Sequence, residues 1–95
     1  MNDRREDASL RTVLRGAEGE LVSVRVKVDP RSLEDLLEAL AGLDFPINPE
    51  IRHTHPSTVV EFPAYEKRLR AIERTIERSG LGAEIELASM LQAIA

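Results

Sequence analysis

Three segments of the chain alternate between apolar and polar residues with a period of two, which is the spacing of a half-buried β-strand. They run over residues 21–28, 58–62 and 84–87, and the first two are rich in β-branched residues. One face of each predicted strand is apolar and is expected to be buried. The residues expected on this buried face are Val22, Val24, Val26, Val28, Val60, Phe62, Ile85 and Leu87.

Two segments between these strands carry apolar residues at the spacing of a helix. Residues 33–40 place leucines at positions i, i+3, i+4 and i+7, so that one apolar stripe forms. Asp29 precedes this segment as a helix N-cap, with a proline at the next position, and Gly42 follows it as a C-terminal glycine. A second stripe, over residues 65–76, is ended by Gly80. The members of the second stripe are Tyr65, Leu69, Ile72 and Ile76.

Residues 43–57 separate the two halves of the chain and contain prolines at positions 46, 49 and 56. A proline in a central strand breaks a hydrogen bond of the ladder, whereas a short edge strand tolerates proline at its flanks. We therefore expect an edge strand near residues 50–55. We also expect Pro63 to end the strand that precedes it.

The order of the predicted elements is β-α-β-β-α-β, which is the order of the ferredoxin-like, split βαβ arrangement. In that arrangement the first and third strands are central, which suits the valine-rich segments, and the proline-flanked second strand lies at an edge. The sequence therefore predicts an α+β, ferredoxin-like βαββαβ domain with a four-stranded antiparallel sheet and two helices on one face. Val24, Val26 and Val60 are expected to be fully buried on parallel neighbouring strands.

Length and composition indicate a single compact domain. The chain has 95 residues, 42% hydrophobic and 32% charged, and a second core would not close at this length. Residues 1–19 are highly charged and sparsely apolar, which is typical of a flexible tail, so residues 20–95 are assigned to the domain. Cysteine is absent, which leaves no disulfide framework and no thiolate metal site and is typical of a reducing compartment.

Charge and hydropathy narrow the expected partners and location. The net charge of −4 argues against a general attraction to nucleic acid or to anionic membranes. The amino terminus is charged, and no run approaches the roughly 18 apolar residues of a membrane span, so a cytoplasmic location is expected. On the second predicted helix, opposite charges recur at i, i+3 and i, i+4 spacings, which is typical of a solvated face.

The polar face of the predicted sheet carries charges of both signs. Its charged residues are Arg25, Lys27, Glu61, Glu84 and Glu86. Opposite charges on neighbouring strands either neutralise one another as a solvated face or form a polar surface for a dimer or another partner. An RNA-recognition sheet needs aromatic residues on its central strands for base stacking, and none is expected here, so no nucleic-acid partner is predicted.

His53 and His55 are the two histidines of the chain, and one residue separates them. Alternate residues of an extended strand point the same way, so both imidazoles would reach one metal ion. Glu50 or Glu61 would supply a third ligand, although the spacing fixes neither. The alternatives are two polar residues of an edge strand near a turn, and a pH-sensitive contact.

The junction between the first strand and the first helix contains Asp29, Pro30 and Arg31. The start of a helix is electrostatically suited to an anion, so Asp29 and Arg31 form a candidate ligand site. The alternative is a plain N-cap followed by a surface arginine. An acylphosphatase-like enzyme has this size and element order, and Arg31 and Asn48 superficially match its arginine and asparagine. The glycine-rich phosphate cradle is missing here, so we expect no enzymatic activity and no cofactor.

The layout of residues 21–88 resembles that of ACT domains, small regulatory modules that sense amino acids and related ligands. The resemblance lies in the strand at 21–28, the turn Asp29-Pro30, the leucine-rich helix and the repeat of this plan through Gly80. The glycine usual in the ligand loop is absent, because Arg31 and Ser32 occupy that stretch.

The resemblance implies a non-enzymatic regulatory or interaction module that self-associates, as a homodimer, with a small molecule as a possible ligand. The alternative function is that of a small metal-binding protein that uses His53 and His55.

Overall fold

The computed structural model describes residues 19–90 of the chain. Its elements follow one another in the predicted order, with a short 3-10 turn ahead of the first helix. The elements are β1 (Leu21–Val28), η1 (Pro30–Ser32), α2 (Leu33–Ala41), β2 (Glu50–Thr54), β3 (Ser57–Tyr65), α3 (Glu66–Ser79) and β4 (Glu84–Ser89). Residues 1–18, nearly all of the predicted tail, lie outside the described residues.

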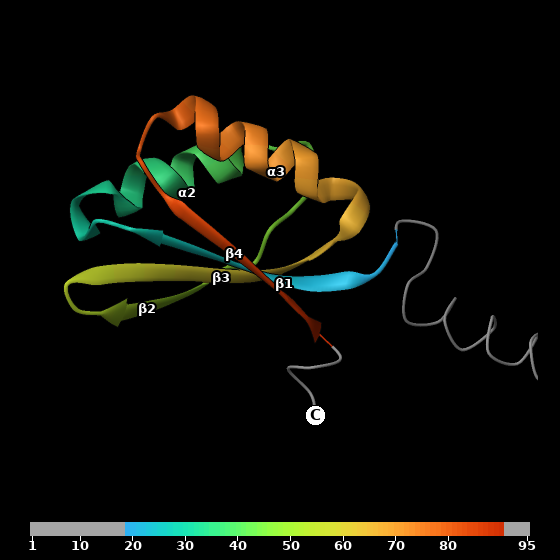
Figure 1. Cartoon of the computed structure of the whole chain (residues 1–95). Helices are drawn as coiled ribbons and strands as arrows, with labels where there is room; N and C mark the ends of the chain where they lie inside the picture. The colour runs from blue at the N-terminus through green and yellow to red at the C-terminus, as the bar shows by residue number, and fades with distance from the viewer. Residues whose placement is uncertain (1–18, 91–95) are drawn as a thin grey trace, which may run out of the picture.

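The four strands form one antiparallel sheet in the order β2-β3-β1-β4, and α2 and α3 cover one face of it (Figure 1). This is the predicted α+β, ferredoxin-like arrangement, with the valine-rich strands in the centre and the proline-flanked strand at an edge. The expectation that β1 and β3 are parallel was wrong, since they pair antiparallel. The crossover through α2 makes β2 run parallel to β1, and the tight β2–β3 turn then reverses the chain.

The core lies between the helix-covered face of the sheet and the two helices. Val24, Val26 and Val60 are fully buried, as the alternation predicts. The helices contribute Leu36 and Leu40 from α2, and Ile72 and Ile76 from α3. Each such side chain contributes roughly 1.5–3 kcal/mol by burial, before the cost of chain entropy is subtracted.

The edge strand β4 is less deeply covered than its apolar pattern predicts. Ile85 is half-buried, whereas Leu87 keeps 46% of its surface exposed. The register places Leu87 opposite Val24, on the helix-covered face. The expectation that Leu87 is buried was therefore correct about the face and wrong about burial, because β4 is an edge strand of the sheet formed by residues 19–90.

Two predicted boundaries near the end of β3 were wrong. Pro63 does not end the strand, which continues to Tyr65, and α3 begins only at Glu66. Tyr65 is thus a strand residue opposite Leu21 and is not part of the helical stripe. Pairing of β2 with β3 stops at Glu61, so Pro63 lies where β3 has β1 as its only neighbouring strand. Its missing N–H therefore costs no bond to β2.

Both helices end at the predicted glycines. Gly42 is the C-cap of α2, and Gly80 closes α3 with a left-handed φ of 67°, a conformation that glycine adopts without steric cost. In the part of the chain that the structure describes, no helix combines the length and the apolar character required to cross a bilayer.

The core assignment is tested by replacing Val26 with aspartate. Val26 has no exposed surface, so an unpaired carboxylate there would cost several kcal/mol and should unfold the domain. Ile51→Asp is the matched control, because Ile51 lies on the same face of the sheet but is 41% exposed. We expect thermal denaturation to show a folded Ile51→Asp protein and an unfolded Val26→Asp protein. A native melting temperature for Val26→Asp would contradict the assignment.

Candidate functional site on the open face of the sheet

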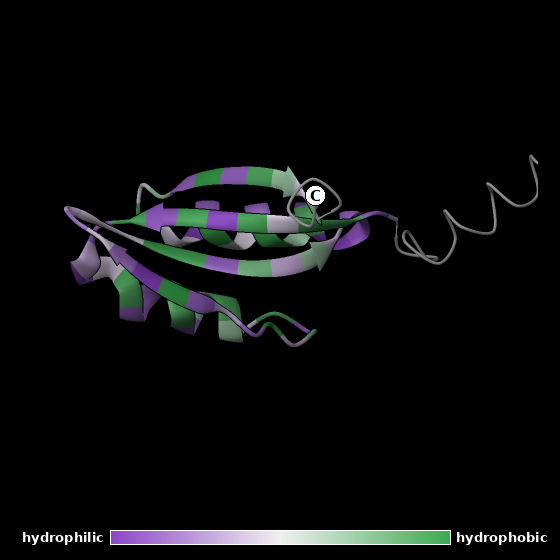
Figure 2. Ribbon diagram, turned by 90° about the horizontal axis from the view of Figure 1, so that it is seen from below, coloured by the Kyte–Doolittle hydropathy of each residue, from purple (hydrophilic) through white to green (hydrophobic). Residues whose placement is uncertain are grey.

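The face of the sheet opposite the helices, which we call the open face, is covered by no helix or strand of the described residues (Figures 1 and 2). Strand register assigns to it the alternate residues of each strand that point away from the helices. They are Leu21, Ser23, Arg25 and Lys27 on β1, Glu50, Arg52 and Thr54 on β2, Ser57, Val59, Glu61, Pro63 and Tyr65 on β3, and Glu84, Glu86 and Ala88 on β4.

The charged side chains of the open face fall into two neighbouring rows that cross all four strands. The first row, the acidic row, reads Glu50, Glu61, Arg25 and Glu86 from β2 to β4. The second row, the basic row, reads Arg52, Val59, Lys27 and Glu84 in the same direction. The end of the face beyond the acidic row is mostly apolar and contains Leu21, Pro63, Tyr65 and Ala88.

The carboxylate of Glu61 is the centre of the acidic row. Its side chain is only 15% exposed, and three side chains from the two neighbouring strands, β1 and β2, donate to it. Arg25 Nε lies 2.7 Å from Oε2, Ser23 Oγ donates to the same oxygen at 2.9 Å, and Arg52 pairs with Oε1. Arg25 also reaches Glu86, at 3.4 Å, so it connects β3 to β4 through β1.

These contacts shift the pKa of both partners in favour of their charged forms. The hydrogen bond from Arg25 is the largest cause that lowers the pKa of Glu61. The hydrogen bond from Ser23 and the charges of Arg52 and Arg25 act in the same direction, against the partial burial of the carboxyl group. The hydrogen bond to Glu61 in turn raises the pKa of Arg25. Glu61 is therefore held ionised as an anchor for two arginines.

Two members of this network, Ser23 and Arg52, were missed by sequence reasoning. The alternation that places Arg25 on the open face also places Ser23 there, so the sequence contained the signal for Ser23. The structure adds that Ser23 is only 5% exposed, which is unusual for a residue on an open face. Arg52 reaches Glu61 because Arg52 lies opposite Val59, and this register depends on the two-residue turn at His55-Pro56. Hydrophobic pattern does not specify the register of a strand whose five residues are all exposed.

The basic row borders a shallow hollow of about 480 Å³ on the open face. The lining contains three cationic and two anionic side chains. The lining residues are Arg25, Lys27, Arg52, Thr54, Val59, Glu84, Ile85 and Glu86. Lys27 lies opposite Glu84 in register, but no ion pair joins Lys27 to another of the described residues. The hollow therefore presents both signs of charge to an incoming surface.

His53 and His55 are not arranged as the alternation predicts. His53 lies on the helix-covered side of β2, where its Nδ1 is 3.1 Å from Thr58 Oγ1. β2 ends at Thr54, so His55 belongs to the turn and does not follow the strand alternation. Within residues 19–90 no three histidine or acidic side chains converge as a metal-binding group. The metal site stays a prediction.

Asp29 and Arg31 lie together at the start of the 3-10 turn. The Asp29 carboxylate accepts a hydrogen bond from Arg31 N at 2.9 Å and lies 3.4 Å from Arg31 Nε. The backbone hydrogen bond is the main cause that lowers the pKa of Asp29. Asp29 therefore caps the 3-10 turn and not, as predicted, the helix itself; the N-cap of α2 is Ser32, which makes no side-chain capping bond. A ligand at Asp29 and Arg31 stays a prediction.

Comparisons of the chain with protein-family models, with curated proteins and with solved structures found no match. The resemblance to ACT domains therefore stays a prediction from the sequence pattern. The candidate function rests on the geometry and charges of the open face.

Replacing Glu61 with glutamine tests its role as the anchor of the open face. The variant loses charge-assisted hydrogen bonds to a largely buried carboxylate, so we expect the free energy of unfolding to fall by about 1–2 kcal/mol. Glu86→Gln is the matched control, because the Glu86 side chain is 72% exposed and its contact with Arg25 is longer. We expect Glu86→Gln to lower the free energy of unfolding by about 0.5 kcal/mol or less. Urea denaturation at low micromolar protein measures both variants. Equal losses in both variants would contradict the anchoring role.

The lowered pKa of Glu61 also predicts how the stability difference between the natural chain and Glu61→Gln depends on pH. The pKa of Glu61 is lower in the folded chain than in the unfolded chain. The ionised carboxylate therefore contributes fully to the free energy of unfolding above the pKa of the unfolded chain, and this contribution is lost as the pH falls through the pKa of the folded chain. The stability difference between the natural chain and Glu61→Gln should be constant from about pH 6 to 8 and shrink below about pH 4. A difference that grew with acidification would show that the pKa shift has the opposite sign.

Proposed function

We propose that this chain is a small interaction module that self-associates through the open face of its sheet. The observation that carries the proposal is a face with both signs of charge in ordered rows and no described helix or strand over it. A two-fold dimer presents the same patch from both subunits, and a patch of mixed sign is suited to binding itself.

The size of the open face supports a dimer of ordinary dimensions. Four strands about 4.8 Å apart, each about seven residues long on average, give about 450 Å² of flat area. The relief of arginine, lysine and glutamate side chains increases the accessible area beyond this value. An interface of roughly 600–1,000 Å² per subunit would be typical.

The edges of the sheet are less suited to pairing than the open face. β2 is short and flanked by Pro49 and Pro56, which limits the addition of another strand. β4 is the cleaner edge, and its exposed Leu87 lies on the helix-covered side. Edge pairing through β4 is therefore the alternative form of self-association, and it would leave the charges of the open face in solvent.

Regulation by a small molecule and a cytoplasmic location belong to the same proposal. Both rest on the resemblance to ACT domains and on the charged, cysteine-free sequence. The hollow beside the basic row offers space for a small ligand that carries charges of both signs, since its lining contains cationic and anionic side chains.

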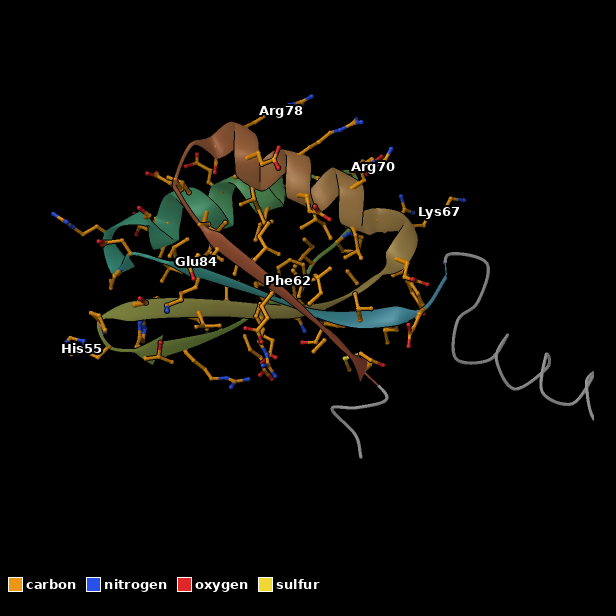
Figure 3. The ribbon with its side chains drawn as sticks, in the orientation of Figure 1. His55, Phe62, Lys67, Arg70, Arg78 and Glu84 are labelled. Carbon is orange, nitrogen blue, oxygen red and sulfur yellow. The ribbon has the colours of Figure 1, made fainter. Side chains whose placement is uncertain are left out.

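Sedimentation equilibrium at tens of micromolar tests self-association. We expect a mass near twice the 10.6 kDa of one chain. Arg25→Glu should weaken the dimer, and more strongly at low salt, where charges are screened least. Arg70→Glu is the control, because Arg70 points away from the sheet on α3 (Figure 3). A mass of one chain throughout this range would refute the proposal.

A further inference from the structure

The order of charges within the two rows limits how two open faces can meet. A two-fold axis in the plane of the interface can lie along the strands or across them. These two orientations bring different residues together, although the same surface is buried in both. Counting attractive and repulsive pairings therefore distinguishes them, given the proposed self-association through this face.

An axis along the strands, between β3 and β1, superimposes each row on the same row of the partner subunit in reversed order. Glu61 then faces Arg25 of the partner subunit, and Arg52 faces Glu84 of the partner subunit. The single repulsive pairing brings together the two edge glutamates of the acidic row. Each pairing occurs twice, so attraction exceeds repulsion by two pairings to one.

An axis across the strands, between the two rows, places the acidic row of one subunit over the basic row of the other. This arrangement sets the arginine and the lysine of β1 against each other and the two glutamates of β4 against each other. The remaining charged pairing, Glu50 with Arg52 of the partner subunit, is attractive. Repulsion therefore exceeds attraction by the same ratio, and like charges opposed across an interface are costly.

We propose that two copies of the chain pack open face to open face about a two-fold axis parallel to the strands, between β1 and β3. Aligned sheets pack about 10 Å apart, a distance that an arginine and a glutamate extended towards each other can span. The axis also brings the apolar ends together, so that Tyr65 lies over Leu21 of the partner subunit. Tyr65 is 38% exposed in the single chain, and this contact would cover it.

Arg52 and Glu84 provide the sharpest test, because they lie on opposite edges of one sheet. Three strand spacings of about 4.8 Å separate β2 from β4, so the two side chains start about 14 Å apart within one chain. Among the described residues no ion pair joins Arg52 to Glu84, and Arg52 pairs with Glu61 instead. The Arg52–Glu61 pair is lost in Arg52→Glu and in the double variant alike, so a difference between these two proteins reports on contacts between subunits.

The experiment compares Arg52→Glu, Glu84→Arg and the double variant by sedimentation equilibrium at low salt. Each single substitution replaces two attractive pairings of the dimer with repulsive ones, so we expect the dissociation constant to rise about ten-fold or more. The double variant restores opposite charges across the interface and should bind at least about five-fold more tightly than Arg52→Glu, with which it shares the loss of the Arg52–Glu61 ion pair. Thermal melts of each variant exclude loss of fold, and Arg70→Glu should leave the dissociation constant unchanged.

The outcomes distinguish failure of this arrangement alone from failure of the proposed function on which it rests. A dimer that both single substitutions weaken without rescue by the double variant overturns the axis and leaves self-association intact. A natural chain that stays monomeric overturns both. Dissociation by Arg70→Glu, with Arg52→Glu without effect, would place the interface on the helices and overturn both the axis and the use of the open face.

Discussion

The structure depends on the position of β1 in the middle of the sheet, with an antiparallel neighbour on each side. Because both neighbours are paired in register over most of its length, the side-chain alternation of β1 applies to the whole sheet. Its valines enter the core beneath the helices, and its serine, arginine and lysine define the open face. A register shift of one residue would exchange these two faces, which makes the pairing highly specific.

Glu61 shows how the same constraint organises the charged side. It lies on β3 directly opposite Arg25 and is reached from β2 by Arg52, so one carboxylate connects three of the four strands. Arg25 extends the network to β4 through Glu86. Exposed ion pairs contribute little individually, and the significance of this network lies in fixing which charges face outward in which order. The proposed dimer uses that order.

The central part of the fold and the strand order could be predicted from the sequence, whereas several boundaries and burials at the periphery could not. The alternation of β1 and the leucine spacing of α2 identified the core, because burial leaves one solution for each. The end of β3 was placed too early, at Pro63, and Tyr65 was assigned to the helix, because a proline is tolerated where a central strand pairs on one side only. The burial of Leu87 was overestimated because an apolar residue on an edge strand need not be covered. His55 was misplaced because its strand ends one residue earlier.

The sequence predicted only part of the candidate site, because alternation assigns a residue to a face but does not fix the register of an exposed edge strand. Alternation placed Arg25, Lys27, Glu61, Glu84 and Glu86 on one face, as the register shows. Arg52 depended on the register of β2, whose exposed residues carry no hydrophobic signal.

Proton NMR with a soluble paramagnetic probe, recorded over a range of protein concentrations, tests self-association through the open face most directly. The methyl groups of Val59, at the centre of the basic row, should become protected from the probe as the concentration rises. The single methyl group of Ala71, which is exposed on α3, should stay accessible throughout. Unchanged accessibility of Val59, or protection of Ala71 in its place, would contradict the account.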